Sequence, residues 1–229
     1  MSDLNYPLRL PQTDSLPATI AERTRRVYDR LAEVYPVSSL LFHARAHKLA
    51  LSTSGILDGM TVLEVATGSG EMFRRLVAAN QTGATFGLDL SPRMASRTQR
   101  RIRREFPAAS TLCKAVDVRT MPFRDASFDA LVCCYLLELL SVQDIHLTVR
   151  EFARVVRPSG VLTLILIGQN VPVFNRVYRV CTRVAPAFWG RQVERSIPAL
   201  VQSAGFTITS DRTVRQTFYP SRILTATRL

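Results

Sequence analysis

The stretch that decides the fold is Val62-Leu-Glu-Val-Ala-Thr-Gly-Ser-Gly-Glu71, an apolar run that ends in two closely spaced glycines. The pattern predicts a buried strand at 61–66 that reverses sharply into a helix. Gly68 and Gly70 give the backbone the freedom for this reversal and let a ligand approach the main chain. The dinucleotide fingerprint G-x-G-x-x-G is not matched, because Phe73 stands where its third glycine would be. A phosphate-binding P-loop is excluded because no Gly-Lys-Ser/Thr follows.

The same alternation of apolar strand and amphipathic helix continues along the chain. It is typical of an α/β fold in which a parallel sheet is covered by helices on both faces. A helix followed by two strands closes the chain. The predicted strands are 61–66, 84–88, 111–116, 128–135, 161–167, 206–213 and 222–227, and the predicted helices are 71–80, 92–105, 142–156 and 196–204.

The segments outside this alternation divide the chain. Residues 1–55 are predicted to form an N-terminal arm and a helical lid, with helices at 18–34 and 37–51. The principal domain then covers residues 56–229. Within it, a helical insertion at 169–205 is expected, with a helix at 173–184. The insertion either caps a lipophilic substrate through its arginines and aromatic residues, or its helix packs on the edge of the sheet.

The composition limits the classes of function. Among 229 residues, 30 are basic and 18 acidic, giving a net charge of +12. All the basic residues except Lys48 and Lys114 are arginines, which attract phosphates. Nucleic acids, anionic lipids and acidic small substrates are all compatible with this charge. The longest apolar run, 161–167, is too short to span a bilayer, and no secretory signal opens the chain. We therefore expect a cytoplasmic protein.

Neither the cysteines nor the histidines predict a metal site. The cysteines Cys113, Cys133, Cys134 and Cys181 lack metal-binding spacing and are expected to be free thiols. The neighbours Cys133 and Cys134 should point to opposite faces of a strand. His43 and His47 are four residues apart on a predicted helix, but no third ligand accompanies them. We expect them to be surface or lid residues.

Three carboxylates lie at or near the ends of successive predicted strands. A carboxylate at Glu64, within an apolar strand, is costly unless it is paired. It could accept hydrogen bonds from the amides of the glycine turn, or face a cationic ligand such as a sulfonium with an α-ammonium group. Asp89 lies about 20 residues past the glycine turn, where an acidic residue binds ribose hydroxyls. Alternatively, Asp89 only caps the next helix, a role that Ser91 could fill. Asp117 follows the third strand and could contact an adenine amino group. Together these residues predict a nucleoside site.

Four ordered motifs carry a family resemblance: Val62–Glu71, Gly87–Met94, Asp117–Asp129 and Glu151–Gly160. They resemble those of the class I S-adenosylmethionine-dependent methyltransferases, most closely the ubiquinone/menaquinone-biosynthesis C-methyltransferase group and its methyltransferase-11-like relatives. The chain departs from the general family pattern at Ala66, where glycine is usual, although alanine is common in the quinone group. Residues 27–35 resemble that group's entry motif, with Pro36 in place of its final Asp.

The resemblance implies a Rossmann-like, seven-stranded, mostly parallel sheet with helices on both faces and one antiparallel strand. It also implies that S-adenosyl-L-methionine is the cofactor. The matched positions would divide its binding between them. The methionine part would be held by Glu64, Ala66, Thr67, Gly68 and Gly70, and the ribose by Asp89. The adenine would contact Leu90, Met94, Asp117 and Val118. The methyl group would lie above Cys134 and Tyr135, and the substrate pocket would be closed by Tyr35.

The resemblance says less about the methyl acceptor. We expect a small lipophilic acceptor, either a quinone-type ring or a lipid headgroup. A nucleic-acid substrate is disfavoured, because Cys134-Tyr135 stands where amino-methylating enzymes carry N/D-P-P-Y/F, and no Pro-Cys dipeptide occurs. The alternatives are a nucleic-acid methyltransferase and a non-catalytic S-adenosylmethionine-binding protein. The oligomeric state stays open.

Two further features are left open by the sequence. Carbon methylation of a ring needs an ionised phenol, and the titratable candidates for a base are Tyr35, Tyr135, Glu138 and His146. The arginines of the helix at 92–105 lie at nearly helical spacing. They form either a solvated face or a contact with an anionic membrane; these residues are Arg93, Arg97, Arg100, Arg101 and Arg104.

Overall fold

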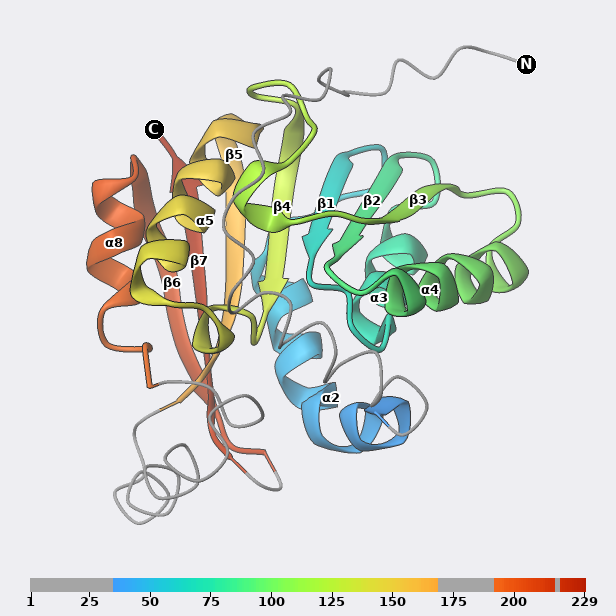
Figure 1. Ribbon diagram of the computed structural model, residues 1–229, viewed down its shortest axis with the longest axis horizontal. Coiled ribbons are helices and arrows are strands. Elements are labelled where there is room, and N and C mark those ends of the chain that lie inside the picture. Colours follow the sequence, from blue (N-terminus) through green and yellow to red (C-terminus); the bar gives the residue numbers. More distant parts are fainter. Residues whose placement is uncertain (1–34, 169–191, 217–218) are drawn as a thin grey trace.

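The computed structural model describes residues 35–168, 192–216 and 219–229, with the side chains described from residue 43 onward. Seven strands form one sheet in the order β3-β2-β1-β4-β5-β7-β6 (Figure 1). All neighbours pair in parallel except at β7, which is antiparallel to both β5 and β6. The strands are β1 (Thr61–Val65), β2 (Ala84–Asp89), β3 (Ser110–Ala115), β4 (Phe128–Cys134), β5 (Val156–Ile167), β6 (Phe206–Val214) and β7 (Ser221–Arg228).

This topology confirms the predicted Rossmann-like sheet with a single antiparallel strand. The chain builds outward from β1 to β3 and then returns to place β4 on the other side of β1. In such a sheet, ligands bind outside the carboxyl ends of the strands at the point where the strand order reverses. The carboxyl ends of β1 and β4 are therefore the place to examine.

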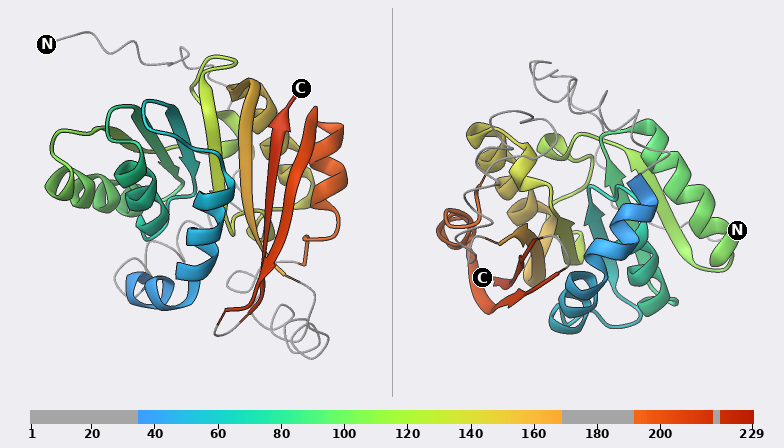
Figure 2. Two further views of the ribbon diagram at one scale, coloured as in Figure 1. Left: turned by 180° about the vertical axis from the view of Figure 1, so that it is seen from behind. Right: turned by 90° about the horizontal axis from the view of Figure 1, so that it is seen from below.

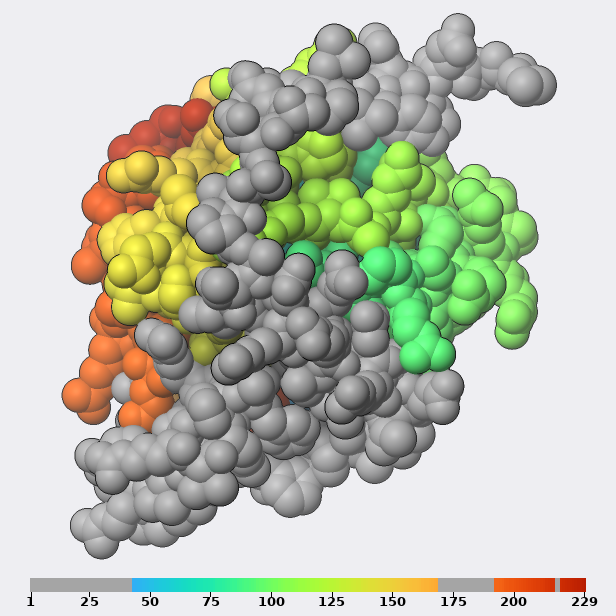
Figure 3. Space-filling view, viewed as in Figure 1, coloured from blue at the N-terminus to red at the C-terminus, as the bar shows by residue number. Residues whose placement is uncertain are grey.

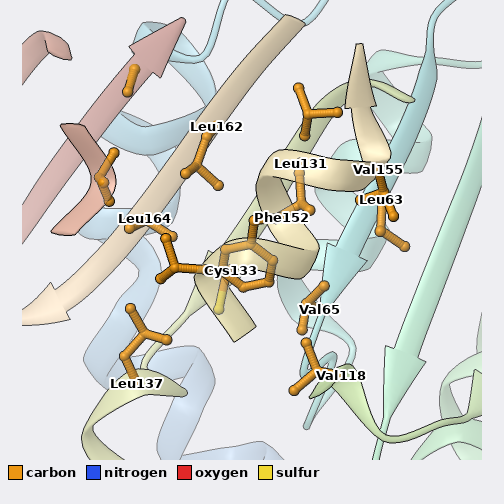
Figure 4. Close-up of a cluster of buried hydrophobic side chains, with 14 of the residues drawn as sticks. Leu63, Val65, Val118, Leu131, Cys133, Leu137, Phe152, Val155, Leu162 and Leu164 are labelled. Carbon is orange, nitrogen blue, oxygen red and sulfur yellow. The ribbon is translucent and has the colours of Figure 1, made fainter. Parts of the chain in front are cut away.

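Helices cover both faces of the sheet (Figures 1 and 2). On one face, α2, α3 and α4 pack over apolar residues such as Val62 and Val132. On the other face, α5 and α8 cover the larger core, in which Phe152 packs among Leu131, Cys133 and Leu164 (Figure 4). The helices are α2 (Tyr35–Thr53), α3 (Glu71–Ala79), α4 (Pro92–Glu105), α5 (Val142–Val155) and α8 (Ile197–Ser203), with 3-10 turns η1 (Val118–Thr120) and η2 (Leu137–Leu139).

Local capping explains why the helices begin where the sequence predicted. The Ser91 side chain accepts a hydrogen bond from the Met94 amide at 3.2 Å, and Pro92 occupies the first turn of α4. In the same way, Ser141 accepts from the Asp144 amide at the start of α5. These caps make the helix starts readable from residue type alone.

One boundary differs from the prediction. The sequence predicts a helix at 142–156 that Pro158-Ser159-Gly160 would end, followed by a strand at 161–167, but β5 already begins at Val156. The strand β5 accommodates these residues by a local break in its regular pairing and backbone conformation. Its pairing with β4 shifts register between Phe128 and Ala130, and Ser159 has a φ of 62°.

Two of the four sequence motifs bind each other within the fold. The Glu151 carboxylate accepts a hydrogen bond from the Met121 amide at 2.8 Å. The Arg154 guanidinium donates to the carbonyl oxygens of Met121 and Phe123 and pairs with Asp125 at 2.8 Å. The Asp117–Asp129 and Glu151–Gly160 motifs are thus joined through α5, which gives them a structural role.

Several predictions lie outside the described residues: the arm and helix within 1–34, the helix at 173–184 and Cys181. The division into a lid at 1–55, a domain at 56–229 and a cap at 169–205 stays a prediction. In the described part, α2 packs on α3 and on β5, β6 and β7. Within the described ranges, no helix combines the length and the hydropathy needed to cross a membrane.

Candidate functional site

The glycine turn between β1 and α3 is held in an unusual backbone conformation. Gly68 and Gly70 have φ values of 49° and 75°, and Ala66 has a φ of 60°. A side chain at Gly70 would come within 2.6 Å of the Thr98 hydroxyl oxygen. Two backbone bonds close the turn: the Thr67 amide donates to Leu88 at 3.0 Å, and the Gly70 amide donates to Thr67 at 2.8 Å. The prediction that this turn needs glycine freedom is confirmed.

Asp89 joins this turn to the end of β2. One of its carboxylate oxygens accepts a hydrogen bond from the Gly68 amide at 2.7 Å, and the other accepts from the Ser91 amide at 2.9 Å. Ser91 itself caps α4. Asp89 therefore does more than cap the helix, because it fixes the main chain of the glycine turn at the carboxyl edge of the sheet.

Glu64 is buried in the middle of the sheet, one residue before the end of β1. It is 1% exposed, and its Oε2 atom has no hydrogen-bond partner among the described residues. Burial, and secondarily the negative charge of Asp89, raises the pKa of this carboxyl well above its usual value. A cation bound beside it would restore ionisation and supply the missing partner. The expected need of Glu64 for a cationic ligand is thus consistent with its surroundings.

Asp117 follows β3, as the sequence predicted, but the chain supplies a partner that the sequence did not reveal. Both of its carboxylate oxygens contact the Arg119 guanidinium, at 2.6 to 3.1 Å, and Arg119 also pairs with Asp144 at 2.9 Å. The Asp117 carboxylate also caps η1 through the Arg119 amide. The contact of Asp117 with adenine stays a prediction. Arg119 already fixes the orientation of the carboxylate that would make this contact.

The other predicted adenine contacts differ in exposure. Leu90 is half-buried directly after β2. Met94 is almost fully buried on α4. The Val118 side chain lies in the larger core, close to Val65 (Figure 4), so its backbone rather than its side chain would face a ligand at this edge.

Cys134 and Tyr135 leave the sheet beside the glycine turn. The pairing of Val65 with Cys133 places the ends of β1 and β4 next to each other. Tyr135 has a φ of 54°, a conformation that residues with a side chain rarely adopt. Its hydroxyl lies 2.7 Å from the Ser221 hydroxyl at the start of β7. As expected, the described cysteines are free, and Cys133 and Cys134 pack on opposite faces of β4.

The sequence predicts that His43 and His47 are surface or lid residues; the surface alternative is wrong, and the lid alternative stays a prediction. They are 9% and 4% exposed, because α2 packs closely on the sheet through the small residues Ala46 and Ala50. Burial lowers the pKa of His43 to about 4 and that of His47 to about 3. The spacing of His43, Ala46, His47 and Ala50 on one helix face was the signal in the sequence. Among the described residues, no group of three metal-binding side chains forms.

The candidate bases fall in different places. Glu138, in η2, is 2% exposed; its Oε1 accepts from the Ile167 amide at 2.7 Å, and its Oε2 has no partner in the described part of the chain. Burial raises the pKa of Glu138 to about 7. His146 is exposed on α5, on the face opposite to α2. Tyr35 begins α2, but its side chain lies outside the description.

The helix α4 lies at one edge of the molecule, within the green surface at the right of Figure 3. The helix buries Met94, Ala95, Thr98 and Ile102, which leaves its basic residues on the outer side. Arg101 pairs with the buried Glu71 at 3.1 Å, so it has a structural role. The exposed arginines are Arg93, Arg100, Arg103 and Arg104.

Comparison with known proteins agrees with this geometry. Residues 62–160 match a family described as "Methyltransferase domain". The chain is 30% identical over 141 residues to 2-phytyl-1,4-naphtoquinone methyltransferase of Trichormus variabilis, covering 59% of this chain and 61% of that protein. It is 29% identical over 162 residues to the ubiquinone/menaquinone biosynthesis C-methyltransferase UbiE of Bdellovibrio bacteriovorus, covering 69% and 67%. The chain therefore spans about three fifths of the first of these relatives.

Solved structures show the same fold. The N-methyltransferase NodS from Bradyrhizobium japonicum, in complex with S-adenosyl-L-homocysteine, superposes with a TM-score of 0.72. The match covers 90% of this chain and 98% of that one at 14% sequence identity. At this identity, the similarity supports the architecture of the sheet and helices.

Proposed function

Because residues 62–160 form a methyltransferase domain, we propose that this chain is an S-adenosylmethionine-dependent methyltransferase that acts on a small lipophilic acceptor. The observation that carries the proposal is Glu64, a buried carboxyl with an unpartnered oxygen beside the glycine turn and Asp89. Among the described residues, no cationic side chain pairs with Glu64, and the α-ammonium group of the cofactor would provide a cation.

The residues at the edge fit the cofactor in three respects. The positive φ of Gly68 and Gly70 leaves room beside the main chain for a bound molecule. Asp89 already accepts the Gly68 and Ser91 amides at this edge, and its carboxylate would bind the ribose hydroxyls. Glu64 would neutralise the ammonium group of the methionine part. When bound, the cofactor supplies a methyl group already activated by a sulfonium.

The protein's part in such a reaction is mainly alignment. In-line displacement requires the nucleophile, the methyl carbon and the sulfur to be collinear, and holding reactants in this way can contribute about 7–11 kcal/mol. The packed ends of β1 and β4 are rigid enough for this task, because both strands are paired on each side. A metal or a catalytic triad is not needed for this chemistry.

For the acceptor we propose a quinone-type ring, with a lipid headgroup as the alternative. The support is the similarity to proteins named as naphthoquinone and ubiquinone/menaquinone methyltransferases, over about three fifths of the first relative. We also propose a cytoplasmic enzyme in peripheral contact with an anionic membrane. The exposed arginines of α4 support this contact, since each basic residue near such a surface contributes about 1 kcal/mol.

The experiment is incubation with methyl-labelled cofactor and separate quinone, lipid and RNA fractions. We expect label in the quinone fraction, or in lipid if the headgroup is the acceptor. Label in RNA would instead identify a nucleic-acid methyltransferase, and cofactor binding without any labelled product would identify a non-catalytic binding protein. Either result would contradict the proposal.

A variant pair tests the cofactor site separately. Asp89→Asn retains the shape of the side chain but loses its charge, so cofactor affinity should fall about tenfold as charge-assisted hydrogen bonds become neutral ones. The matched control is Asp58→Asn, whose carboxylate accepts the Thr82 amide at 2.9 Å before β1, at the amino edge of the sheet. Isothermal titration should show unchanged affinity for this control. Equal affinity in wild type and Asp89→Asn would contradict the assigned site.

A further inference from the structure

Four polar side chains form a series of contacts that runs from the end of β3 to the start of α5. They are Asp117 after β3, Arg119 in η1, and Ser141 and Asp144 at the start of α5. We call them the Arg119 network. The four residues come together because α5 packs on η1. Only Asp117 belongs to the predicted cofactor site, so the network raises the question of what its other members contribute there.

The guanidinium of Arg119 fixes the plane of the Asp117 carboxylate. Its Nε atom lies 3.0 Å from Asp117 Oδ1 and 3.1 Å from Oδ2, and its Nη2 atom donates to Oδ2 at 2.6 Å. The backbone amide of Arg119 also donates to Oδ1, at 3.0 Å. An arginine that faces both oxygens of a carboxylate restrains the rotation of that group as well as its position.

Arg119 is itself held in place by the first turn of α5. Its Nη1 atom donates to Asp144 Oδ1 at 2.9 Å, and the Ser141 hydroxyl donates to Asp144 Oδ2 at 2.7 Å. Ser141 also accepts from the Asp144 amide as the cap of the helix. The guanidinium therefore cannot turn away from Asp117 without losing its bond to Asp144.

The Asp117 carboxylate can still accept a further hydrogen bond. Each carboxylate oxygen has two lone pairs, and the single Nε proton of Arg119 is shared between Oδ1 and Oδ2. Oδ2 otherwise accepts only from Nη2, so it retains an acceptor position. The Asp117 side chain is 29% exposed, whereas that of Arg119 is 10% exposed. A ligand can therefore reach the carboxylate, and the arginine lies behind it.

Asp117 also lies beside Asp89, the residue assigned to the ribose. In the parallel pairing of β2 with β3, Asp89 is opposite Ala115. The Val116 amide then donates to the Asp89 carbonyl oxygen at 2.9 Å. The two carboxylates thus follow neighbouring strands at one edge of the sheet, which is the arrangement that the sequence predicts for a nucleoside.

We propose that Arg119 is a positioning residue that makes the cofactor site selective for a 6-aminopurine. Held by Asp144, it orients Asp117 so that the remaining acceptor position of Oδ2 receives a hydrogen bond from the exocyclic amino group. Without Arg119, two neighbouring carboxylates would share no cation, and their repulsion would displace Asp117 toward solvent. This inference rests on the proposed function. The contact of Asp117 with adenine is expected from the sequence, and the structure adds the residue that would make this contact selective.

The test measures a preference between two ligands, because a purely structural role of Arg119 would weaken both alike. The probes for calorimetric titration are S-adenosylhomocysteine and its 6-deamino analogue, in which a hydrogen atom replaces the amino group. Arg119→Met removes the guanidinium, and Arg119→Lys retains the charge but not the planar fork. The matched control is Arg157→Met, which breaks a pair with Asp129 at 2.8 Å on the amino edge of the sheet. Melting temperatures verify that each variant is folded.

The wild type and Arg157→Met should bind S-adenosylhomocysteine about tenfold more tightly than the analogue, which corresponds to one hydrogen bond to a charged acceptor. Arg119→Met and Arg119→Lys should bind the two probes about equally. A tenfold preference that survives in either folded variant would overturn the role of Arg119. So would equal binding of both probes by the wild type, and that result would leave the proposed function intact. A wild type that binds neither probe would overturn both proposals.

Discussion

Replacement of Glu138 by Gln should change how the stability of the protein depends on pH. Burial raises the pKa of this carboxyl from 4.5 to about 7 in the folded protein. A carboxyl whose pKa is raised by folding stabilises the folded state fully at low pH. That contribution begins to fall above pH 4.5, where the unfolded chain ionises, and is lost as the pH rises through about 7.

The magnitude follows from the two pKa values. At about 1.4 kcal/mol per pH unit, the interval from 4.5 to about 7 corresponds to about 3.4 kcal/mol. About 2.5 kcal/mol of this develops between roughly pH 5 and pH 8.5. Glutamine has nearly the same shape as protonated glutamic acid, can accept the Ile167 amide that Glu138 now accepts, and does not ionise. The variant should therefore gain about 2.5 kcal/mol relative to the wild type over this range.

Urea denaturation at several pH values measures this difference directly. Subtracting the wild-type curve removes the contributions of other titrating groups, since both proteins share them. The matched control is Glu105→Gln, the same substitution at an exposed glutamate at the end of α4. If the Glu138→Gln curve runs parallel to that of the wild type, the carboxyl is not held neutral by burial and our description of this site is wrong.

Three further predictions concern stability. Gly70→Ala should lower the free energy of unfolding by about 1–3 kcal/mol, because φ is 75° and the new methyl would press on Thr98; chemical denaturation measures it. Arg154→Met should cost about 2–4 kcal/mol, because Glu151 and two carbonyl groups lose their partner; a melting temperature within 1 °C or so of wild type would contradict the link between the two motifs. His47→Gln should make the free energy of unfolding less sensitive to acid. The pKa of His47 falls on folding from 6.5 to about 3, so the wild type loses stability as the pH drops below 6.5. This loss amounts to about 3 kcal/mol at roughly pH 4, and denaturation at that pH should show that the variant avoids it.

The elements that the sequence predicted correctly are those specified by local chemistry. The start of α4 follows from Ser91 and Pro92, and the start of α5 follows from Ser141. The buried strands follow from their apolar runs, because parallel strands covered on both faces have no polar side. The start of β5 was missed for the opposite reason: the pairing of Val156 with Phe128 overrides the turn preference of the residues that follow.

The candidate site was predictable to the extent that its residues sit at strand ends. Glu64 and Asp89 could be placed at one edge because parallel strands end together. The pairing of Asp117 with Arg119 was readable in principle, since the two are separated by one residue, but the bond from Arg119 to Asp144 spans 25 positions. The contact of His43 with Tyr219 spans 176 positions. Periodicity in the sequence does not predict contacts between residues so far apart, so these contacts are known only from the structure.

The buried groups without partners give the strongest connection between the fold and its function. Glu64 Oε2, Glu138 Oε2 and His47 Nδ1 are all buried and unpartnered within the described residues. Each such group costs about 1–3 kcal/mol, a large fraction of the stability of a domain of this size. Glu64 and Glu138 lie near the carboxyl ends of β1 and β4, and His47 lies on the helix above them. A fold selected for stability alone would fill these positions with apolar side chains. At Glu64, the ammonium group of the proposed cofactor would supply the partner that the described residues do not.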